Sequence, residues 1–293
     1  MDRKDFLKKG LLGTGMFAAT TALGNVLKND VDEIKPLEII GYNHLPNSED
    51  VDVQENTVLH KATTRGKADH GWLLSCHTFS FANYYNPKRM HFGVLRVLND
   101  DRVEAGMGFG THPHDNMEII SIPLEGDLEH KDSMGNVALI KNGDIQVMSA
   151  GTGITHSEYN KNTDRQVKFL QIWVFPNKRN VTPRYDQITL KPGQRHNKFQ
   201  QIVSPDPADA GVWINQDAWF HLGKFDNNFA STYTVKRKGN GVYAFIIKGS
   251  AIIQGQQLEG RDGFGVWDTA TLSIKATSQD AEILLMDVPM MLS

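Results

Sequence analysis

The stretch Gly106-Met-Gly-Phe-Gly-Thr-His-Pro-His-Asp-Asn-Met-Glu118 is the most informative part of this sequence. Its two histidines, His112 and His114, stand two positions apart, and side chains at i and i+2 of a β-strand face the same side of a sheet. Later in the chain, His156 and Glu158 repeat this spacing. The glycines before His112 allow close backbone approach. If two such strands face each other, four donor groups surround one point.

Three imidazoles and one carboxylate form a donor set that suits a divalent transition metal. Nitrogen and oxygen donors accept Fe, Mn, Ni, Cu or Zn, and ligand type alone does not choose among them. A six-coordinate ion held by four side chains would keep two positions for water, substrate or dioxygen. The alternative is a polar cluster that only forms hydrogen bonds inside the fold. We therefore predict a metal site at His112, His114, His156 and Glu158.

The sequence around these residues predicts short β-strands separated by turns. Asn99–Asp101 and Lys141–Gly143 have the composition of turns. No amphipathic helix of convincing length is present here, so a closed or sandwich-like all-β architecture is expected. The predicted strands are Val94–Leu98, Glu118–Leu124, Leu128–Lys131, Asn136–Ile140, Asp144–Met148 and Val167–Phe175.

A second β-rich half resembles the first. Val242–Ile247 followed by Lys248-Gly249 repeats the pattern of Ile119–Leu124 followed by Glu125-Gly126, which indicates an internal repeat of about 100–120 residues. The second copy has no His-x-His pair. We expect three segments here, namely a metal-binding domain at 56–176, a linker at 177–192 and a domain without metal ligands at 193–293.

The N-terminus has the layout of an export signal. Met1–Lys9 is basic, and small, weakly apolar residues follow as far as Gly24. Arg3-Lys4 resembles a twin-arginine signal with Lys in the second position. We therefore predict a signal at 1–24, a flexible lead-in at 25–55 and a periplasmic or exported protein. The apolar region is too short to span a membrane, so no stable membrane anchor is expected. The alternative is an uncleaved tail on a cytoplasmic protein.

Composition and motifs give no support to several other classes of function. The chain has 293 residues and a net charge of −3, which gives no electrostatic support for nucleic-acid binding. Its one cysteine, Cys76, rules out an intramolecular disulfide. No glycine-rich phosphate loop, Ser-His-Asp order or Cys-x-x-Cys pair is present.

Two segments, Thr111–Asn136 and Gly143–Asn160, resemble the two conserved motifs of cupins, and specifically the pirin family. The resemblance extends over roughly residues 55–290 and is greatest to bacterial pirin-like proteins with quercetin dioxygenase activity. Asp115-Asn116-Met117 stands where the family usually has Arg-Gly-Phe, and Ser149 stands where proline is usual. The first of these differences leaves the metal ligands unchanged and affects the mouth of the pocket.

The resemblance implies a bicupin, two tandem β-barrels of the double-stranded β-helix (jelly-roll) type, with the metal in the N-terminal barrel. It assigns Glu158 to the metal, whereas Glu118, the usual cupin carboxylate, takes a supporting or pocket role. Iron is the metal expected first, with Mn, Ni, Cu and Zn as alternatives.

The activity implied is oxidative cleavage of a flavonol such as quercetin by O2 in a monomeric enzyme, with Glu158 as the catalytic base that takes the substrate's 3-hydroxyl proton. Two alternatives stay open. The protein is a non-enzymatic regulatory or redox-sensing pirin, or it is another small-molecule cupin enzyme such as an isomerase.

Overall fold

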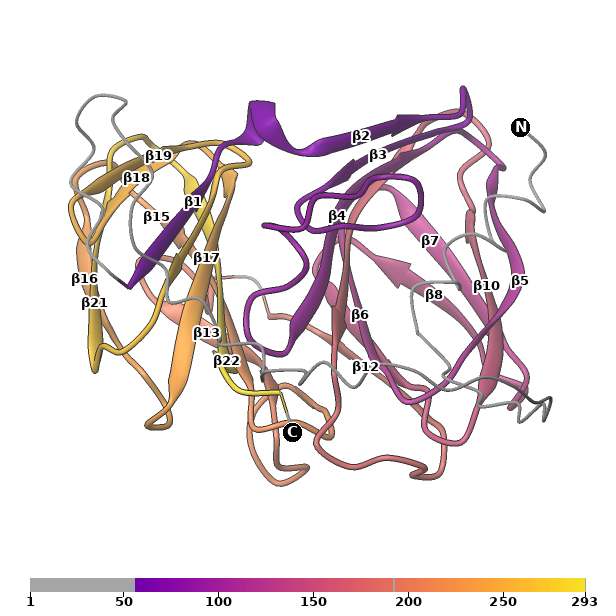
Figure 1. The fold of residues 1–293 in the computed structure, drawn as a ribbon. Helices are drawn as coiled ribbons and strands as arrows, with labels where there is room; N and C mark the ends of the chain where they lie inside the picture. Colours follow the sequence, from indigo (N-terminus) through magenta and orange to yellow (C-terminus); the bar gives the residue numbers. More distant parts are fainter. Residues whose placement is uncertain (1–55, 192, 293) are drawn as a thin grey trace, which may run out of the picture.

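The computed structural model describes residues 56–191 and 193–292. The predicted signal at 1–24 and the predicted lead-in at 25–55 lie outside the described residues. Within the described part the fold consists of strands and one short 3₁₀ turn, Ala62–Thr64. The strands form two barrels that stand side by side, which confirms the expected all-β bicupin (Figure 1).

The N-terminal barrel is built from a seven-stranded and a four-stranded antiparallel sheet. The larger sheet contains, in spatial order, β12 (Arg184–Thr189), β9 (Asp144–Ser149), β6 (Glu118–Glu125), β11 (Val167–Val174), β4 (Leu95–Val103), β3 (Leu73–His77) and β2 (Gly66–Asp69). The smaller sheet contains β5 (Gly108–His114), β10 (Ile154–Asn160), β7 (Asp127–Asp132) and β8 (Val137–Lys141).

The C-terminal barrel is also built from a seven-stranded and a four-stranded sheet. Its larger sheet contains β1 (Thr57–His60), β20 (Gly263–Val266), β17 (Asn240–Lys248), β22 (Ala281–Pro289), β15 (Trp219–Phe225), β13 (Phe199–Ser204) and β14 (Val212–Trp213), and β14 runs parallel to β13. Its smaller sheet contains β16 (Ala230–Thr234), β21 (Thr271–Ala276), β18 (Ser250–Ile253) and β19 (Gln256–Glu259). The smaller sheets of the two barrels share one strand order, so β16 and β21 take the places of β5 and β10.

One hydrophobic core joins the two barrels. It includes Leu98 and Ile120 from the first large sheet and Phe220 and Phe245 from the second, all of them buried. Burial of apolar surface is the main favourable term in folding. The shared core therefore stabilises both barrels together and fixes their position relative to each other.

The first described strand, β1, belongs to the C-terminal barrel although the strands that follow it build the N-terminal one. β1 pairs with β20 of the C-terminal barrel, and only the following β2 enters the N-terminal one. In Figure 1 the indigo β1 lies among the orange and yellow strands. The range 177–192, which we predicted as a linker, contains β12, and β12 pairs with β9. Both short strands cover the edge of a sheet, which would otherwise expose unpaired backbone groups.

The turn predicted at Asn99–Asp101 is wrong, because these residues continue β4. All three side chains are buried. Asn and Asp are typical of turns in water-exposed chain. Here Asp101 accepts a hydrogen bond from Ser75 inside the barrel, and Asp100 pairs with Arg65 and Arg261. Asp101 therefore adds a polar group to the interior of the N-terminal barrel, whereas Asp100 lies on the opposite face of β4 and reaches Arg261 of the C-terminal half.

Candidate metal centre

Two neighbouring strands, β5 and β10, bring three histidines together. His112 lies directly opposite His156 in the antiparallel pair, and His114 lies opposite Ile154. Burial alternates along β10, which turns His156 and Glu158 toward the interior. One ring nitrogen from each of His112, His114 and His156 lies within 4.8 Å of the others. The His-x-His pair and the first residue of His-x-Glu thus meet as predicted from their spacing.

The three imidazole rings lie close together, and His112 and His156 are buried while His114 is partly buried. The ring centroids of His112 and His156 are 4.5 Å apart, and His114 lies 4.8 and 4.9 Å from these two rings. Burial, together with the charge of His112, lowers the pKa of His114 to about 3. Burial also lowers the pKa of His112 and holds that of His156 well below its usual value. All three rings are therefore neutral near pH 7, the form that binds metals.

The hydrogen bonds around the rings leave nitrogen atoms free to face a metal. His112 Nδ1 lies 2.8 Å from the carbonyl oxygen of Gly110. This contact places the ring proton on Nδ1 and leaves Nε2 as the ligand atom. His156 Nε2 is buried and has no hydrogen-bond partner in the described part of the chain. An unpaired buried nitrogen is costly, so these residues fit a divalent metal ion.

Glu158 lies two residues beyond His156, after a break in the pairing of β10 with β5. Its carboxylate accepts hydrogen bonds from Ser121 Oγ and Gln171 Nε2, both at 3.2 Å. The group of ligand atoms within 4.8 Å contains the three histidines and not this carboxylate. Metal ligation by Glu158 therefore stays a prediction. Burial raises the pKa of Glu158 to about 7, which suits a group that takes and returns a proton near neutral pH.

Glu118 faces the other barrel. Its carboxylate accepts hydrogen bonds from Ser149 Oγ at 2.6 Å and from Asn215 Nδ2, in the C-terminal half, at 3.0 Å. Burial raises the pKa of Glu118. Ser121, three residues along β6, points to the opposite face and reaches Glu158. Glu118 is therefore not part of the histidine cluster and instead links the two halves of the molecule.

His130 and Asp132 on β7 lie next to His156 and take part in its hydrogen-bond network. His130 Nε2 lies 3.0 Å from Asp132 Oδ2, and His130 Nδ1 lies 3.4 Å from His156 Nδ1. The ring of Tyr185 packs on His130 at 4.7 Å. Asp132 and His130 therefore help to orient the ring of His156, as hydrogen-bond partners of metal-binding histidines commonly do. Its sequence signal is the spacing of His130 and Asp132, which again places both on one face.

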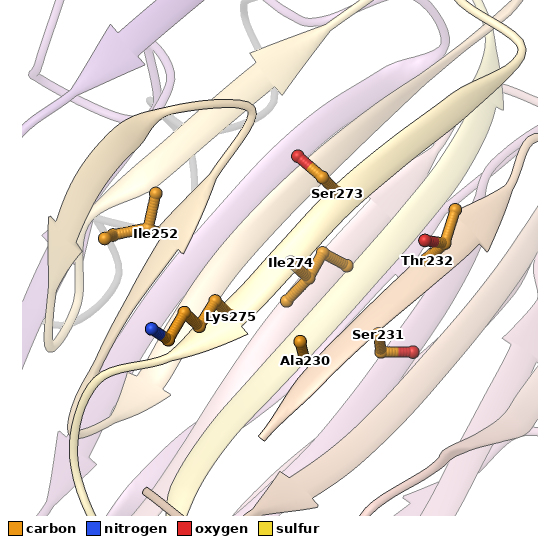
Figure 2. Close-up of a pocket in the computed structure, with 7 residues that line it drawn as sticks. All are labelled: Ala230, Ser231, Thr232, Ile252, Ser273, Ile274 and Lys275. Carbon is orange, nitrogen blue, oxygen red and sulfur yellow. The ribbon is translucent and has the colours of Figure 1, made fainter. Parts of the chain in front are cut away.

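Among residues 193–292, the second barrel has no comparable cluster. β16 and β21 carry no histidine, and side chains such as Leu272 and Val242 fill the interior. Figure 2 shows a pocket whose lining residues come from β16, β18 and β21 of this barrel. Its lining residues are Ala230, Ser231, Thr232, Ile252, Ser273, Ile274 and Lys275. Lys275 is its only ionisable group, so we assign this pocket no chemistry.

Among residues 56–191 and 193–292, no helix has the length and apolar character needed to cross a membrane.

Two family models match the chain. The model described as Pirin matches residues 58–174, and the model described as Quercetinase C-terminal cupin domain matches residues 201–288. The first range contains all four predicted ligands. The second begins beyond the segment that we had predicted as a linker.

Several curated proteins and solved structures are similar over most of the chain. Quercetin 2,3-dioxygenase of Escherichia coli is 45% identical over 231 residues, which cover 79% of this chain and 98% of that protein. A pirin-like protein of Caulobacter vibrioides is 39% identical, with coverages of 76% and 95%. The crystal structure of the bacterial pirin YhhW from Escherichia coli, in complex with nickel(II), superimposes with a TM-score of 0.75 at 43% identity, with coverages of 80% and 99%.

Proposed function

Since the chain belongs to the pirin family, we propose that it is a metal-dependent dioxygenase that cleaves flavonols such as quercetin with O2. The observation that carries this proposal is the buried cluster of His112, His114 and His156, with His156 Nε2 unpaired. The name of the Escherichia coli relative, quercetin 2,3-dioxygenase, supports the same activity. So does the match of the C-terminal half to a quercetinase cupin domain.

One divalent metal would be held by His112, His114, His156 and Glu158. When bound, it would supply Lewis acidity that favours the ionised form of a substrate hydroxyl. Iron stays the metal that we expect first, with Mn, Ni, Cu and Zn as alternatives. The nickel(II) complex of the relative YhhW shows that one member of the family binds a divalent ion of this series.

The protein residue that we expect to move a proton is Glu158. Its carboxylate would accept the proton of the flavonol 3-hydroxyl and so produce the electron-rich anion that reacts with O2 with loss of carbon monoxide. Ser121 and Gln171 hold this carboxylate in place. General bases work best when their pKa lies near the operating pH, and burial brings the pKa of Glu158 to about 7.

Aromatic side chains shape the approach to the site. The ring of Trp173 lies edge-on to His114 at 4.9 Å, and the ring of Phe81 lies edge-on to Trp173 at 5.4 Å. Apolar walls of this kind suit a flat aromatic substrate and keep water away from it. Binding pockets with a few polar groups on apolar walls are typical of small-molecule sites.

The test is to load the protein with each candidate metal, add quercetin in air, and follow flavonol absorbance, oxygen uptake and carbon monoxide. We expect all three signals to change together in the metal-loaded protein and to be lost in His156→Ala. Bound metal without oxygen uptake would instead favour an isomerase-like cupin enzyme or a regulatory, redox-sensing pirin.

We also infer that the protein acts outside the cytoplasm as a monomer. The basic residues of Met1–Lys9 followed by small apolar residues support export. Sequencing the N-terminus of protein taken from the periplasm would test this. A periplasmic chain that begins near residue 25 is the expected result, and a full-length chain found only in the cytoplasm would contradict it.

A further inference from the structure

A row of polar side chains crosses the inner face of the larger N-terminal sheet. His77, Asn99, Gln171 and Ser121 occupy paired positions on β3, β4, β11 and β6. Residues directly opposite each other in antiparallel strands point to the same face. Because Gln171 and Ser121 both bond to Glu158, the whole row faces the interior of the barrel, beside the metal centre.

Two members of this row have polar atoms without partners. Both ring nitrogens of His77 and both amide atoms of Asn99 are buried and have no hydrogen-bond partner among the described residues. Each residue is only 1% exposed. Trp173 Nε1 is likewise a buried atom with no hydrogen-bond partner among the described residues. Buried polar groups in folded proteins are almost always paired, and leaving them unpaired is costly. Several buried and unpaired polar atoms in one region of the barrel interior indicate a place where a polar ligand supplies the missing hydrogen bonds.

These residues are connected to the metal centre by ring contacts. Trp173 lies edge-on to the ligand His114 at 4.9 Å, Phe81 contacts Trp173 at 5.4 Å, and His77 contacts Phe81 at 5.3 Å. Asn99 lies between His77 and Gln171 in the sheet. A ligand bound at the metal and extending along Trp173 would therefore meet Asn99 and His77.

We propose that His77, Asn99 and Trp173 recognise the part of the substrate that points away from the metal, and that this part is a planar ring bearing hydroxyl groups. The proposal rests on the proposed function and adds to it the basis of substrate choice. These three residues would determine which hydroxylated aromatic compounds bind.

The donors and acceptors of the three residues match phenolic hydroxyls. Trp173 Nε1–H only donates, Asn99 offers two N–H donors and a carbonyl acceptor, and a neutral imidazole offers one of each. Burial lowers the pKa of His77 to about 4, so its ring is neutral near pH 7. A phenolic hydroxyl both donates and accepts, and neighbouring hydroxyls satisfy such a set. The rings of Phe81 and Trp173 provide apolar contacts to the substrate ring.

The test is calorimetric binding without oxygen, so that no turnover occurs. Metal-loaded protein is titrated with quercetin, kaempferol and galangin, flavonols with two, one and no hydroxyls on the pendant ring. We expect affinity to fall about tenfold from quercetin to galangin, the order expected for the net loss of one or two hydrogen bonds. His77→Phe and Asn99→Leu are expected to remove this preference while binding galangin as well as the natural protein does.

His221→Phe is the matched control. His221 is also a buried histidine, but it lies in the C-terminal barrel, with Nδ1 3.4 Å from Tyr233 Oη, so this variant should keep the preference. Thermal unfolding of the ligand-free proteins is a second measurement. Since replacing unpaired polar atoms by apolar ones is neutral or stabilising, His77→Phe and Asn99→Leu should unfold no earlier than the natural protein.

Equal affinity of the natural protein for the three flavonols would overturn the proposal even if neither variant folds. Variants that keep the natural ranking would overturn it as well. Both results are compatible with full quercetin turnover, so they leave the proposed function standing. A hydroxyl preference without metal-dependent oxygen uptake would support the recognition surface and contradict the dioxygenase.

Discussion

Glu158 combines burial with two hydrogen-bond donors, and this combination decides its chemistry. Ser121 and Gln171 fix its carboxylate, while burial raises its pKa to about 7. A positive ion bound nearby would lower that pKa again, because an opposite charge favours the ionised form. Under the proposed function, a filled metal centre would therefore favour the ionised form of Glu158, the form that accepts a proton.

Glu158→Gln is expected to keep part of the metal and to lower quercetin turnover by about a hundredfold or more, the usual size of a general-base contribution. The measurement is the initial rate of flavonol loss together with metal content. Glu125→Gln is the control, because Glu125 is exposed and pairs with Lys168 on the surface. Turnover close to that of the natural protein, with undiminished metal in Glu158→Gln, would rule out the base.

Asp101 is a second buried carboxyl of this barrel, and burial raises its pKa from 3.8 to about 8. The folded protein thus keeps a proton that the unfolded chain loses near pH 4. The stability linked to this proton is fully present below pH 4 and is lost as the pH rises toward 8.

Asp101→Asn removes this titration and keeps an acceptor for Ser75. We expect the variant to become more stable relative to the natural protein as the pH rises from 5 to about 8. Urea unfolding of the metal-free proteins at several pH values measures the difference, in which the titrations of the buried histidines cancel. A difference that does not change with pH would show that Asp101 is ionised in the folded state.

At the scale of elements, strand β1 depends on a glycine. A Cβ at Gly265 of β20 would lie 2.4 Å from a ring carbon of Phe92 and 2.9 Å from a methyl carbon of Val58. Val58 is the residue of β1 that pairs with Gly265. The absence of a side chain therefore lets β1 and the first barrel approach the second closely.

Gly265→Ala is expected to lower the free energy of unfolding by about 1–3 kcal/mol, the usual effect of overpacking. Gly260→Ala is the control, since its nearest atom beyond the chain neighbours would be 3.6 Å away. Chemical denaturation of both variants measures the effect. Equal unfolding free energies of the two variants would mean that β1 moves to make room for the added methyl group at little cost.

The elements differ in how far the sequence predicts them. The histidine pair, the hairpin at Lys141–Gly143 and the strand at Val167–Val174 follow from local spacing, so they could be predicted. β1 and β12 are short, and their partners are distant in the chain, so composition does not reveal which barrel they join. The turn predicted at Asn99–Asp101 was wrong because polar residues usually mark turns, whereas here they continue β4. The contact of His130 with His156 can be predicted only once β7 and β10 are known to pair.

The whole molecule is two barrels that share one core, and the histidine cluster found among the described residues lies in the N-terminal one. The N-terminal interior holds the histidines and the polar row, whereas the interior of the C-terminal barrel is largely hydrocarbon. Contacts such as Arg184 over the ring of Trp213, at 3.9 Å, join the halves near their surface. The second barrel therefore stabilises the N-terminal one through the shared core, and β1 adds a strand to the second barrel before the chain enters the first.

This architecture predicts one cooperative unfolding transition. Because both large sheets contribute to the same core, neither barrel keeps its buried surface when the other unfolds. Differential scanning calorimetry of the metal-free protein should give a single peak with equal calorimetric and van't Hoff enthalpies. Two resolved peaks would show that the barrels are independent.

The measurement that tests the account most directly is the metal content of protein purified from its native compartment, compared with that of His156→Ala. We predict one divalent ion per natural chain and almost none in the variant, with thermal unfolding showing that the variant is still folded. Natural protein that is free of metal and takes up no divalent ion on incubation, or a folded His156→Ala that binds as much metal as the natural protein, would contradict the metal centre.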